Sequence, residues 1–381
     1  MTLKDQPNLG GFDSDPDRSF NMPAAYYTDQ DIFKREKEAI FFKSWRFVGH
    51  ITEMPEPGDY LTQDICGQNV FVVRDAKGGI NGFYNVCQHR AHELVSGRRG
   101  NVKAVITCPY HAWAYGLDGS LRNARFADRI EGFHTSDFGL STIRVEIFCG
   151  FVFVNLDTDA RPIGECAPGF EETFRAHAPD LDAMVWTGQA NFDIAANWKV
   201  VAENGLDGYH VFLSGPAHKA LGELMDGHNL KMTTHEGWAK LHAHAGTGDN
   251  KAYGYSTGKG QTNEYVTMLL WPDLLLFTLP GANGVWSFLM APEGPGHTRE
   301  EIAAYTPGGA AMDDATKEAV RYMNEVLGPE DVGLNIGVQK GLNSRGYRQG
   351  RLMVDDARSD MSEHTIHFVQ LMTLKALGDL A

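Results

Sequence analysis

Two pairs of cysteine and histidine residues stand close together in the sequence, in a pattern typical of metal binding. Cys87 and His89 are separated by one residue, and Cys108 and His111 by two. Thiolate and imidazole ligands in two such pairs suit a tetrahedral metal, and a structural zinc ion is the simplest interpretation. Structural zinc pairs usually have two to four residues between their members, so the first pair is unusual for zinc. The repeated order, Cys then His, instead favours two iron ions, one held by the cysteines and one by the histidines.

That division of ligands is the arrangement of a Rieske [2Fe-2S] cluster, which stores and passes one electron. We therefore expect a Rieske cluster with Cys87 and Cys108 on the inner iron and His89 and His111 on the outer iron. Because such a cluster only transfers electrons, the function of the chain must be decided elsewhere.

A second group of candidate ligands lies in residues 197–218, "NWKVVAENGLDGYHVFLSGPAH". Asp207 and His210 are three residues apart, a helical spacing that would let the carboxylate hydrogen-bond and orient the imidazole. Pro216 argues against a continued helix, so we expect His218 to come from a turn. Two histidines and a distant carboxylate would form the facial triad of a mononuclear non-haem Fe(II) site. The alternative is an exposed helix and loop with ordinary polar residues.

The two groups of candidate ligands fall in two regions with different secondary-structure patterns. Short β-rich runs such as "RFVGHI", "NVFVVRD" and "GFVFVNL", broken by Gly and Asn turns, predict a compact β domain over 45–157. From 158 to 381 longer helical patterns alternate with strands such as "LLLFTLP" and "GVWSFLMA", which predicts a mixed helix and sheet domain.

The N-terminal region, 1–44, should form an arm and a helix that pack on the second domain. Its first eighteen residues are rich in Gly, Asp and Pro and predict a loose arm. A helix is expected from about Asp29 to Phe42, with Thr28 as its N-cap.

Composition narrows the class of protein. The 381 residues carry a net charge of -15, which argues against nucleic acid as a partner. Neither a long apolar run nor a secretory signal is present, so we expect a cytoplasmic protein without a membrane partner. Five cysteines, two of them beside histidines, argue against a disulfide framework. No glycine-rich nucleotide-binding motif follows a strand, so electrons must come from another protein.

Several stretches resemble the catalytic (α) subunits of the Rieske oxygenase family. "YNVCQHRAHEL", "SGRRGN" and "CPYHAWAYGLDGSL" are similar to the two cluster loops, and residues 197–218 are similar to the catalytic iron segment. The resemblance covers about residues 26 to 370. It implies an α+β fold, with a β-rich Rieske domain and an antiparallel-sheet-and-helix catalytic domain. It also implies two cofactors, the [2Fe-2S] cluster and a mononuclear non-haem Fe(II).

The resemblance also implies roles for single residues. Asp207 would link His111 of one protomer to His210 of the next, and His210 matches the first iron histidine. His218 is our choice for the second, because "GPAH", which ends in it, resembles the stretch at the second iron histidine of relatives that act on quaternary amines, and His228 is the fallback. Asp331 is expected as the carboxylate ligand, and the adjacent Glu330 is its rival.

The implied function is that of a terminal oxygenase component, which uses O2 and electrons from a reductase, with or without a ferredoxin. Because "AENGLDGYHV" resembles oxygenases of the benzoate type, we expect ring hydroxylation of an aromatic compound. The alternative is a monooxygenase acting on a quaternary ammonium compound of the carnitine, betaine or choline type, which "GPAH" and the C-terminal region resemble. A remoter alternative is an electron-transfer protein without oxygenase activity.

The expected assembly is a homotrimer, to which a small β subunit could be added. A head-to-tail ring would bring the cluster of one chain close to the catalytic iron of another. Around the cluster motif, Arg90, Arg98, Arg99 and Lys103 form a basic group in an acidic chain and could attract an acidic electron donor.

Overall fold

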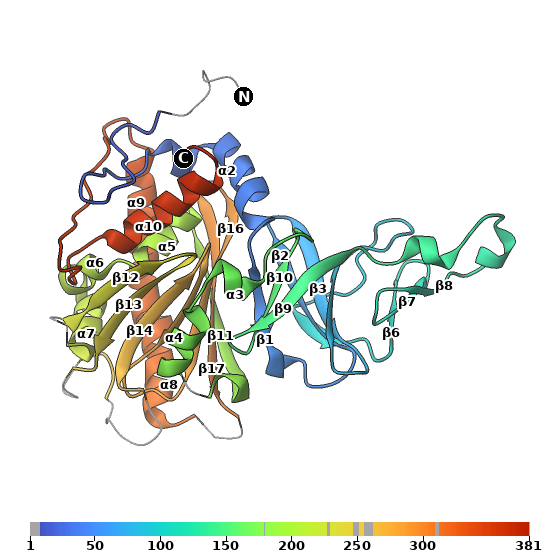
Figure 1. Cartoon of the computed structure of the whole chain (residues 1–381). Helices are drawn as coiled ribbons and strands as arrows, with labels where there is room; N and C mark the ends of the chain where they lie inside the picture. Colours follow the sequence, from blue (N-terminus) through green and yellow to red (C-terminus); the bar gives the residue numbers. More distant parts are fainter. Residues whose placement is uncertain are drawn as a thin grey trace. The chain divides into compact units, whose positions relative to one another are not determined.

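The computed structural model describes residues 8–178, 180–226, 229–246, 251–254, 262–308 and 312–380. Its contacts divide the chain into two compact units (Figure 1). One unit consists of residues 41–163, and the other combines residues 1–40 with 164–381. In the described part of the chain, no helix has the length and apolar character needed to cross a bilayer.

The unit of residues 41–163 is built on antiparallel strands. Its larger sheet has the order β1-β10-β9-β4-β3-β2-β5, and a small sheet has the order β6-β7-β8. The strands are β1 (Arg46–His50), β2 (Asp59–Ile65), β3 (Gln68–Arg74), β4 (Ile80–Tyr84), β5 (Arg99–Asn101), β6 (Val105–Thr107), β7 (Ala114–Gly116), β8 (Leu121–Asn123), β9 (Thr142–Phe148) and β10 (Phe151–Asn155). Short 3-10 turns lie at η2 (Ile51–Glu53), η3 (Ala127–Arg129) and η4 (Thr135–Phe138).

One apolar core in this unit joins the two sheets. Phe71 and Phe83 of the larger sheet and Tyr115 of the small sheet are buried in the same cluster as Cys87 and Cys108. Because the cysteines belong to this core, the loops that carry them are anchored to both sheets.

The larger unit is centred on an antiparallel sheet with the order β11-β17-β16-β15-β14-β13-β12. Its strands are β11 (Met184–Ile194), β12 (Lys231–His235), β13 (Trp238–His244), β14 (Glu264–Leu270), β15 (Leu274–Thr278), β16 (Val285–Gly294) and β17 (His297–Pro307). The helices are α1 (Ala25–Thr28), α2 (Gln30–Glu36), α3 (Ile163–Cys166), α4 (Phe170–His177), α5 (Trp198–Asn204), α6 (Gly208–Leu213), α7 (Pro216–Leu224), α8 (Asp314–Arg321), α9 (Gly328–Leu342) and α10 (His364–Ala376), with a 3-10 turn η5 (Leu181–Ala183) and π-helical turns η1 (Lys37–Phe41) and η7 (Tyr322–Leu327).

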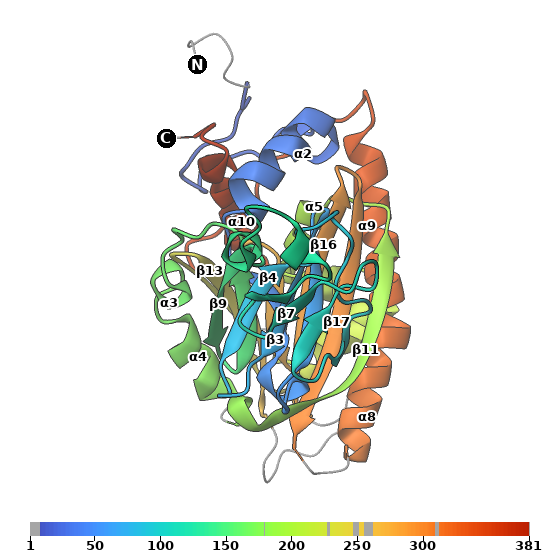
Figure 2. The same cartoon turned by 90° about the vertical axis from the view of Figure 1, so that its right-hand side faces the viewer.

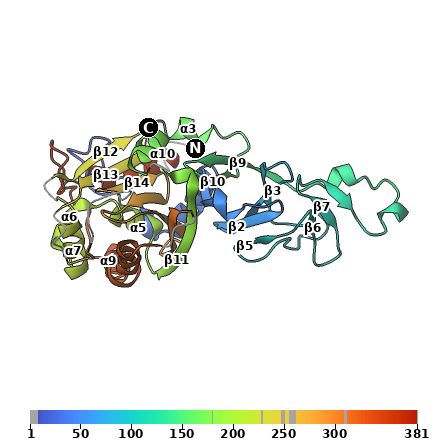
Figure 3. The same cartoon turned by 90° about the horizontal axis from the view of Figure 1, so that it is seen from below.

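Helices cover both faces of this sheet. Figure 2 shows α3 and α4 on one face and α9 on the other, and Figure 3 shows α9 end-on beside α5. Contacts of α5 with α9, β16 and β17 place α5 on the α9 face, and α4 contacts β14. The α10 helix packs on α5, β12 and β13. The sheet is therefore the middle layer of three, and this mixed architecture confirms the predicted α+β class.

Two predicted helix boundaries are wrong in detail. Asp29, not Thr28, caps α2, because its carboxylate accepts hydrogen bonds from the backbone N–H groups of Asp31 and Ile32. Pro216 does end the helix before it, but it also begins α7, since the first position of a helix has no need of the missing N–H. His218 therefore lies in the first turn of a helix and not in an irregular turn.

The N-terminal segment packs on the larger unit through buried polar groups. The carboxylate of Glu36 is buried and accepts hydrogen bonds from Trp198 Nε1 at 3.0 Å and Lys199 Nζ at 2.5 Å. Further upstream, Phe12 stacks on His367 with ring centroids 5.3 Å apart. The described part of the first eighteen residues is thus held against the C-terminal helix and is not a loose arm.

Candidate functional site

Two loops of residues 41–163 carry the Cys–His pairs, one between β4 and β5 and one between β6 and β7. The backbone N–H of Cys87 donates to the carbonyl of His92, and that of Cys108 donates to the carbonyl of Trp113, both at 2.8 Å. Each cysteine carbonyl also accepts a hydrogen bond from the residue four positions later. The two loops are therefore built on the same hydrogen-bond pattern.

Both loops turn on an alanine in the left-handed region. Ala91 has a φ of 57° and Ala112 a φ of 55°, each four residues after its cysteine. A residue with a Cβ adopts this conformation at a cost, so the surrounding structure must hold it. The two loops carry the same costly backbone conformation at the same position, which supports a shared purpose for them.

The side chains of these loops suit a cluster with an inner and an outer end. Cys87 and Cys108 are each 2% exposed, whereas the rings of His89 and His111 lie further out, with centroids 4.7 Å apart. The hydroxyl of Tyr115 lies 3.3 Å from Cys87 Sγ, and the His89 ring stacks on Trp113. His111 Nδ1 is buried without a hydrogen-bond partner, which is the arrangement expected of a nitrogen reserved for a metal.

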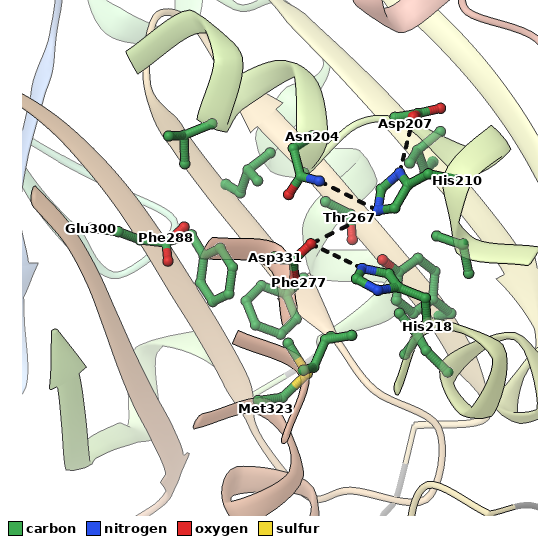
Figure 4. Close-up of a pocket in the computed structure, with 18 residues that line it drawn as sticks. Asn204, Asp207, His210, His218, Thr267, Phe277, Phe288, Glu300, Met323 and Asp331 are labelled. Carbon is green, nitrogen blue, oxygen red and sulfur yellow. Dashed lines mark hydrogen bonds and ion pairs between the residues drawn. The ribbon is translucent and has the colours of Figure 1, made fainter. Parts of the chain in front are cut away.

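The second group of predicted ligands converges in the larger unit. His210 comes from α6, His218 from α7 and Asp331 from the first turn of α9. Asp331 Oδ1 lies 2.9 Å from His218 Nε2 and 3.8 Å from His210 Nε2. Figure 4 shows both imidazoles turned toward this carboxylate. Two histidines and a carboxylate with all ligand atoms within 4.8 Å fit a mononuclear Fe(II) site.

Each of these histidines is oriented by a further carboxylate at its other ring nitrogen. Asp207 Oδ2 lies 2.9 Å from His210 Nδ1, and Glu330 Oε1 lies 2.5 Å from His218 Nδ1. Asp207 is also the N-cap of α6, and Glu330 accepts hydrogen bonds from the backbone N–H groups of Ala217 and His218. Carboxylates in this position fix the ring and its tautomer, so that Nε2 is free to bind a metal.

The electrostatics of the group also fit a cation. Burial alone would lower the pKa of His210, but hydrogen bonds to Asp207 and Asp331 outweigh it and raise this pKa to about 9. The pKa of Asp331 is lowered, because the two imidazoles overcome the effect of burial. In the absence of metal, protons on the imidazoles therefore balance the carboxylates, and a metal ion would take over that role.

Other sequence predictions have different outcomes. Glu330 contacts His218 Nδ1, whereas Asp331 contacts His218 Nε2, the nitrogen that faces His210. The geometry therefore favours Asp331 over Glu330 as the carboxylate ligand. The fallback residue His228 lies outside the described residues. Arg98 and Arg99, expected to attract a partner, lie 3.0 Å and 3.6 Å from Glu53, which offsets part of their charge.

A pocket extends from the histidines to the inner face of the sheet. Its walls include Phe277 and Phe288, whose ring centroids lie 4.9 Å apart, and the buried carboxyl group of Glu300 on β17. Figure 4 shows Glu300 on the far side of Phe288 from His210 and His218. Burial, and secondarily the charge of Asp331, raise the pKa of Glu300 to about 8.

Sequence reasoning missed Glu300 and Phe288. Neither residue belongs to a motif, and only the alternation of side chains along their strands directs them to the pocket face. The neighbouring residue Glu301 points the other way and lies 3.0 Å from Arg299.

Comparison with known proteins identifies both units. Residues 44–134 match the Rieske [2Fe-2S] domain, and residues 181–375 match the catalytic domain of the ring hydroxylating alpha subunit. The carnitine monooxygenase oxygenase subunit of Acinetobacter baumannii is 35% identical over 94% of this chain and 95% of its own length.

Two solved structures are similar over almost the whole chain. A quaternary ammonium Rieske monooxygenase in complex with L-carnitine is 34% identical, with a TM-score of 0.87, and covers 97% of this chain and 99% of its own. A structure of such a monooxygenase, described as giving insights into inter-subunit electron transfer, is 32% identical with a TM-score of 0.86 and covers 97% and 100%.

These matches correct one expectation. The prediction that the chain hydroxylates an aromatic ring is wrong, because the relatives that are 34–35% identical over nearly its full length are carnitine and quaternary ammonium monooxygenases. The resemblance of "AENGLDGYHV" to the benzoate type covers only ten residues, next to the predicted iron ligand His210, and does not decide the substrate.

The remaining expectations of family and cofactors are confirmed. The enzyme receives electrons from separate electron-transfer proteins and acts on a small molecule. The chain belongs to the Rieske oxygenases, oxidoreductases that use O2 with a Rieske [2Fe-2S] cluster and a mononuclear non-haem iron.

Proposed function

We propose that this chain is the oxygenase component of a monooxygenase that hydroxylates a small quaternary ammonium compound of the carnitine, betaine or choline type. The charge of the pocket carries the proposal. Asp207, Glu300 and Asp331 line it; Asp207 and Asp331 pair with the histidines, which leaves Glu300 to face a substrate, and the described lining residues include neither lysine nor arginine. A fixed cation would be attracted to such a site, whereas an aromatic acid would find no basic side chain to pair with.

Aromatic side chains near Glu300 support the same class of substrate. Phe277 and Phe288 line the pocket with their rings in an edge-to-face arrangement. A quaternary ammonium group has no N–H to donate, so it is recognised by aromatic faces and by a nearby negative charge. Burial raises the pKa of Glu300 to about 8, and a bound cation beside it would favour its ionised form. The ammonium end of the substrate would therefore lie toward Glu300, and the remainder of the molecule toward His210 and His218.

The cofactor ligands belong to the proposal as well. Cys87 and Cys108 would hold the inner iron of the cluster, and His89 and His111 the outer iron. His210, His218 and Asp331 would hold the mononuclear iron. When bound, this iron would supply the activation of O2: with two electrons from the reductase and two protons, one oxygen atom enters a C–H bond of the substrate and the other leaves as water.

The residues around the iron ligands have separate tasks. Asp207 and Glu330 keep the Nδ1 protons of His210 and His218, so that both imidazoles bind through Nε2. Apolar side chains such as Leu275 and Phe288 exclude water from the rest of the pocket.

Electrons would reach the site across a subunit boundary. We propose a homotrimer in which His111 of one protomer meets Asp207 of the next, and Asp207 leads to His210. The Asp207 carboxylate is 20% exposed and lines a second hollow beside α9 and α10, where another protomer could reach it. A similar enzyme is described in terms of inter-subunit electron transfer, which supports this assembly. A reductase, with or without a ferredoxin, would supply the electrons.

A single-turnover experiment tests the function without knowledge of the natural reductase. The iron-loaded enzyme is reduced chemically, freed of excess reductant, mixed with one candidate substrate and exposed to O2, and products are identified by mass spectrometry. We expect hydroxylation or C–N cleavage with at least one of carnitine, glycine betaine and choline. Product from benzoate or anthranilate alone would contradict the proposal.

A further inference from the structure

Three histidines and a glutamate gather on the face of the central sheet opposite the active-site pocket. Leu241 and Tyr265 line the pocket, so strand alternation turns His242 and Glu264 to the other face. His244 shares the face of His242 and is paired in register with Glu264.

The helix α4 brings the remaining member of this group. It packs on β14 on this face, and its last residue is His177. Figure 1 shows α4 lying across β14. Residues far apart in the sequence thus meet where one helix ends over two neighbouring strands.

The four side chains present their ligand atoms to one another. Glu264 Oε2 lies 2.5 Å from His177 Nδ1, and Glu264 Oε1 lies 3.2 Å from His242 Nε2 and 3.4 Å from His244 Nδ1. The ligand atoms of His177, His242 and Glu264 all lie within 4.8 Å of one another. Ligands of one tetrahedral metal ion lie about 3.3 Å apart, which follows from bonds of about 2.0–2.1 Å.

The hydrogen bonds of the group leave one buried nitrogen unused. His242 Nε2 is shielded from solvent. Although Glu264 Oε1 lies close to it, no well-directed hydrogen bond joins the two atoms. A buried imidazole nitrogen without a well-directed hydrogen bond costs free energy, which a bound metal would recover. His244 is 67% exposed, so an ion can enter the group from solvent.

We propose that His177, His242 and Glu264, with His244 as a fourth ligand, form a binding site for a borderline divalent metal ion such as Zn2+. Imidazole and carboxylate ligands without a thiolate are the set that zinc accepts in proteins. The ion would tie α4 to β13 and β14 and so clamp the sheet behind the pocket residues Tyr265 and Thr267. This site is separate from the iron ligands and independent of the proposed substrate.

Zinc binding to the iron-loaded enzyme tests the proposal. Zn2+ is titrated in competition with a chromophoric chelator, while the iron content is followed to exclude displacement of iron. We expect one zinc equivalent to bind with the iron content unchanged. We expect His177→Ala and His242→Ala each to weaken this binding by at least about 100-fold, since even the loss of a residue that only orients a ligand costs 10- to 100-fold.

A matched control is His297→Ala, which removes a histidine from a more exposed group with Asp193 and Glu293. It should leave zinc binding unchanged. If the alanine variants fold poorly, His242→Gln keeps the size of the side chain and should still lose the binding, while circular dichroism reports the fold. Equal zinc affinity in wild type and His242→Gln, or loss of binding in His297→Ala alone, would overturn the proposal.

Discussion

Two carboxylates fix the orientation of the imidazole rings of the active-site histidines. Asp207 and Glu330 hold the Nδ1 atoms of His210 and His218, and both Nε2 atoms then point to Asp331. The sequence suggested the pair of Asp207 and His210 from its helical spacing, but Asp207 is the cap of that helix and not a member of it. The role of Glu330 could not be foreseen, because its partner lies 112 positions away in the chain.

The first prediction at this scale concerns Asp207. Replacement by alanine removes the carboxylate that orients His210 and that would receive electrons from the neighbouring protomer. We expect Asp207→Ala to keep the absorption spectrum of the Rieske cluster and to lower kcat by at least about 100-fold. Asp207→Glu keeps the carboxylate and should recover much of the activity. Full turnover in Asp207→Ala would rule out the electron route described above.

The second prediction concerns Glu330. Glu330→Gln weakens the hold on His218, because an amide is a poorer acceptor than a carboxylate. We expect the affinity for the mononuclear iron to fall by about 10- to 100-fold, measured as iron content after dialysis against a chelator. The two irons of the cluster should remain. Glu325→Gln, at an exposed position, is the control, and an equal loss of iron in both variants would contradict the role of Glu330.

At the scale of elements, local patterns predicted the strands better than the helix ends. Apolar runs such as "LLLFTLP" mark β15 because they are short and rich in apolar residues. Pro216 misled the prediction for His218, since a proline that ends one helix can begin the next. The polar contacts that anchor α2 depend on Glu36 meeting Trp198 and Lys199, which no local pattern reveals.

A third prediction follows from the contact between the N-terminal segment and α5. Burial raises the pKa of Glu203 to about 8 from 4.5, even though the Tyr27 hydroxyl donates to its carboxylate at 2.6 Å. Between these pH values the folded chain keeps a proton that the unfolded chain releases. The free energy of unfolding contributed by this group must therefore fall as the pH rises from 4.5 to about 8.

The Glu203→Gln variant removes this titration and keeps an acceptor for Tyr27. We expect its denaturant midpoint to decline less than that of wild type between about pH 5 and pH 8. The exposed replacement Glu38→Gln should follow wild type. Parallel pH profiles for wild type and Glu203→Gln would show that the pKa of Glu203 is not raised.

At the scale of the whole molecule, the motifs revealed the family and both cofactors but not the substrate. The pocket is assembled from α5, α6, α7, α9 and several strands, so its lining is scattered over more than a hundred positions. The net charge of -15 did not indicate the substrate, because it does not show which acidic residues line the pocket. Glu300 lines it only because its side chain lies on the pocket face of the sheet. A similar acid one residue later, Glu301, lies on the other face and contributes nothing to the pocket.

The most direct test of the account compares a cation with its neutral isostere. The quantity to measure is the ratio of kcat/KM for a trimethylammonium substrate to kcat/KM for the analogue in which a tert-butyl group replaces that ammonium group. We predict a preference for the cation in wild type and in Glu301→Gln, and a loss of at least about tenfold in this ratio in Glu300→Gln, or about 1.4 kcal/mol. The same ratio in wild type and Glu300→Gln would contradict the claim that this acidic pocket selects a quaternary ammonium compound.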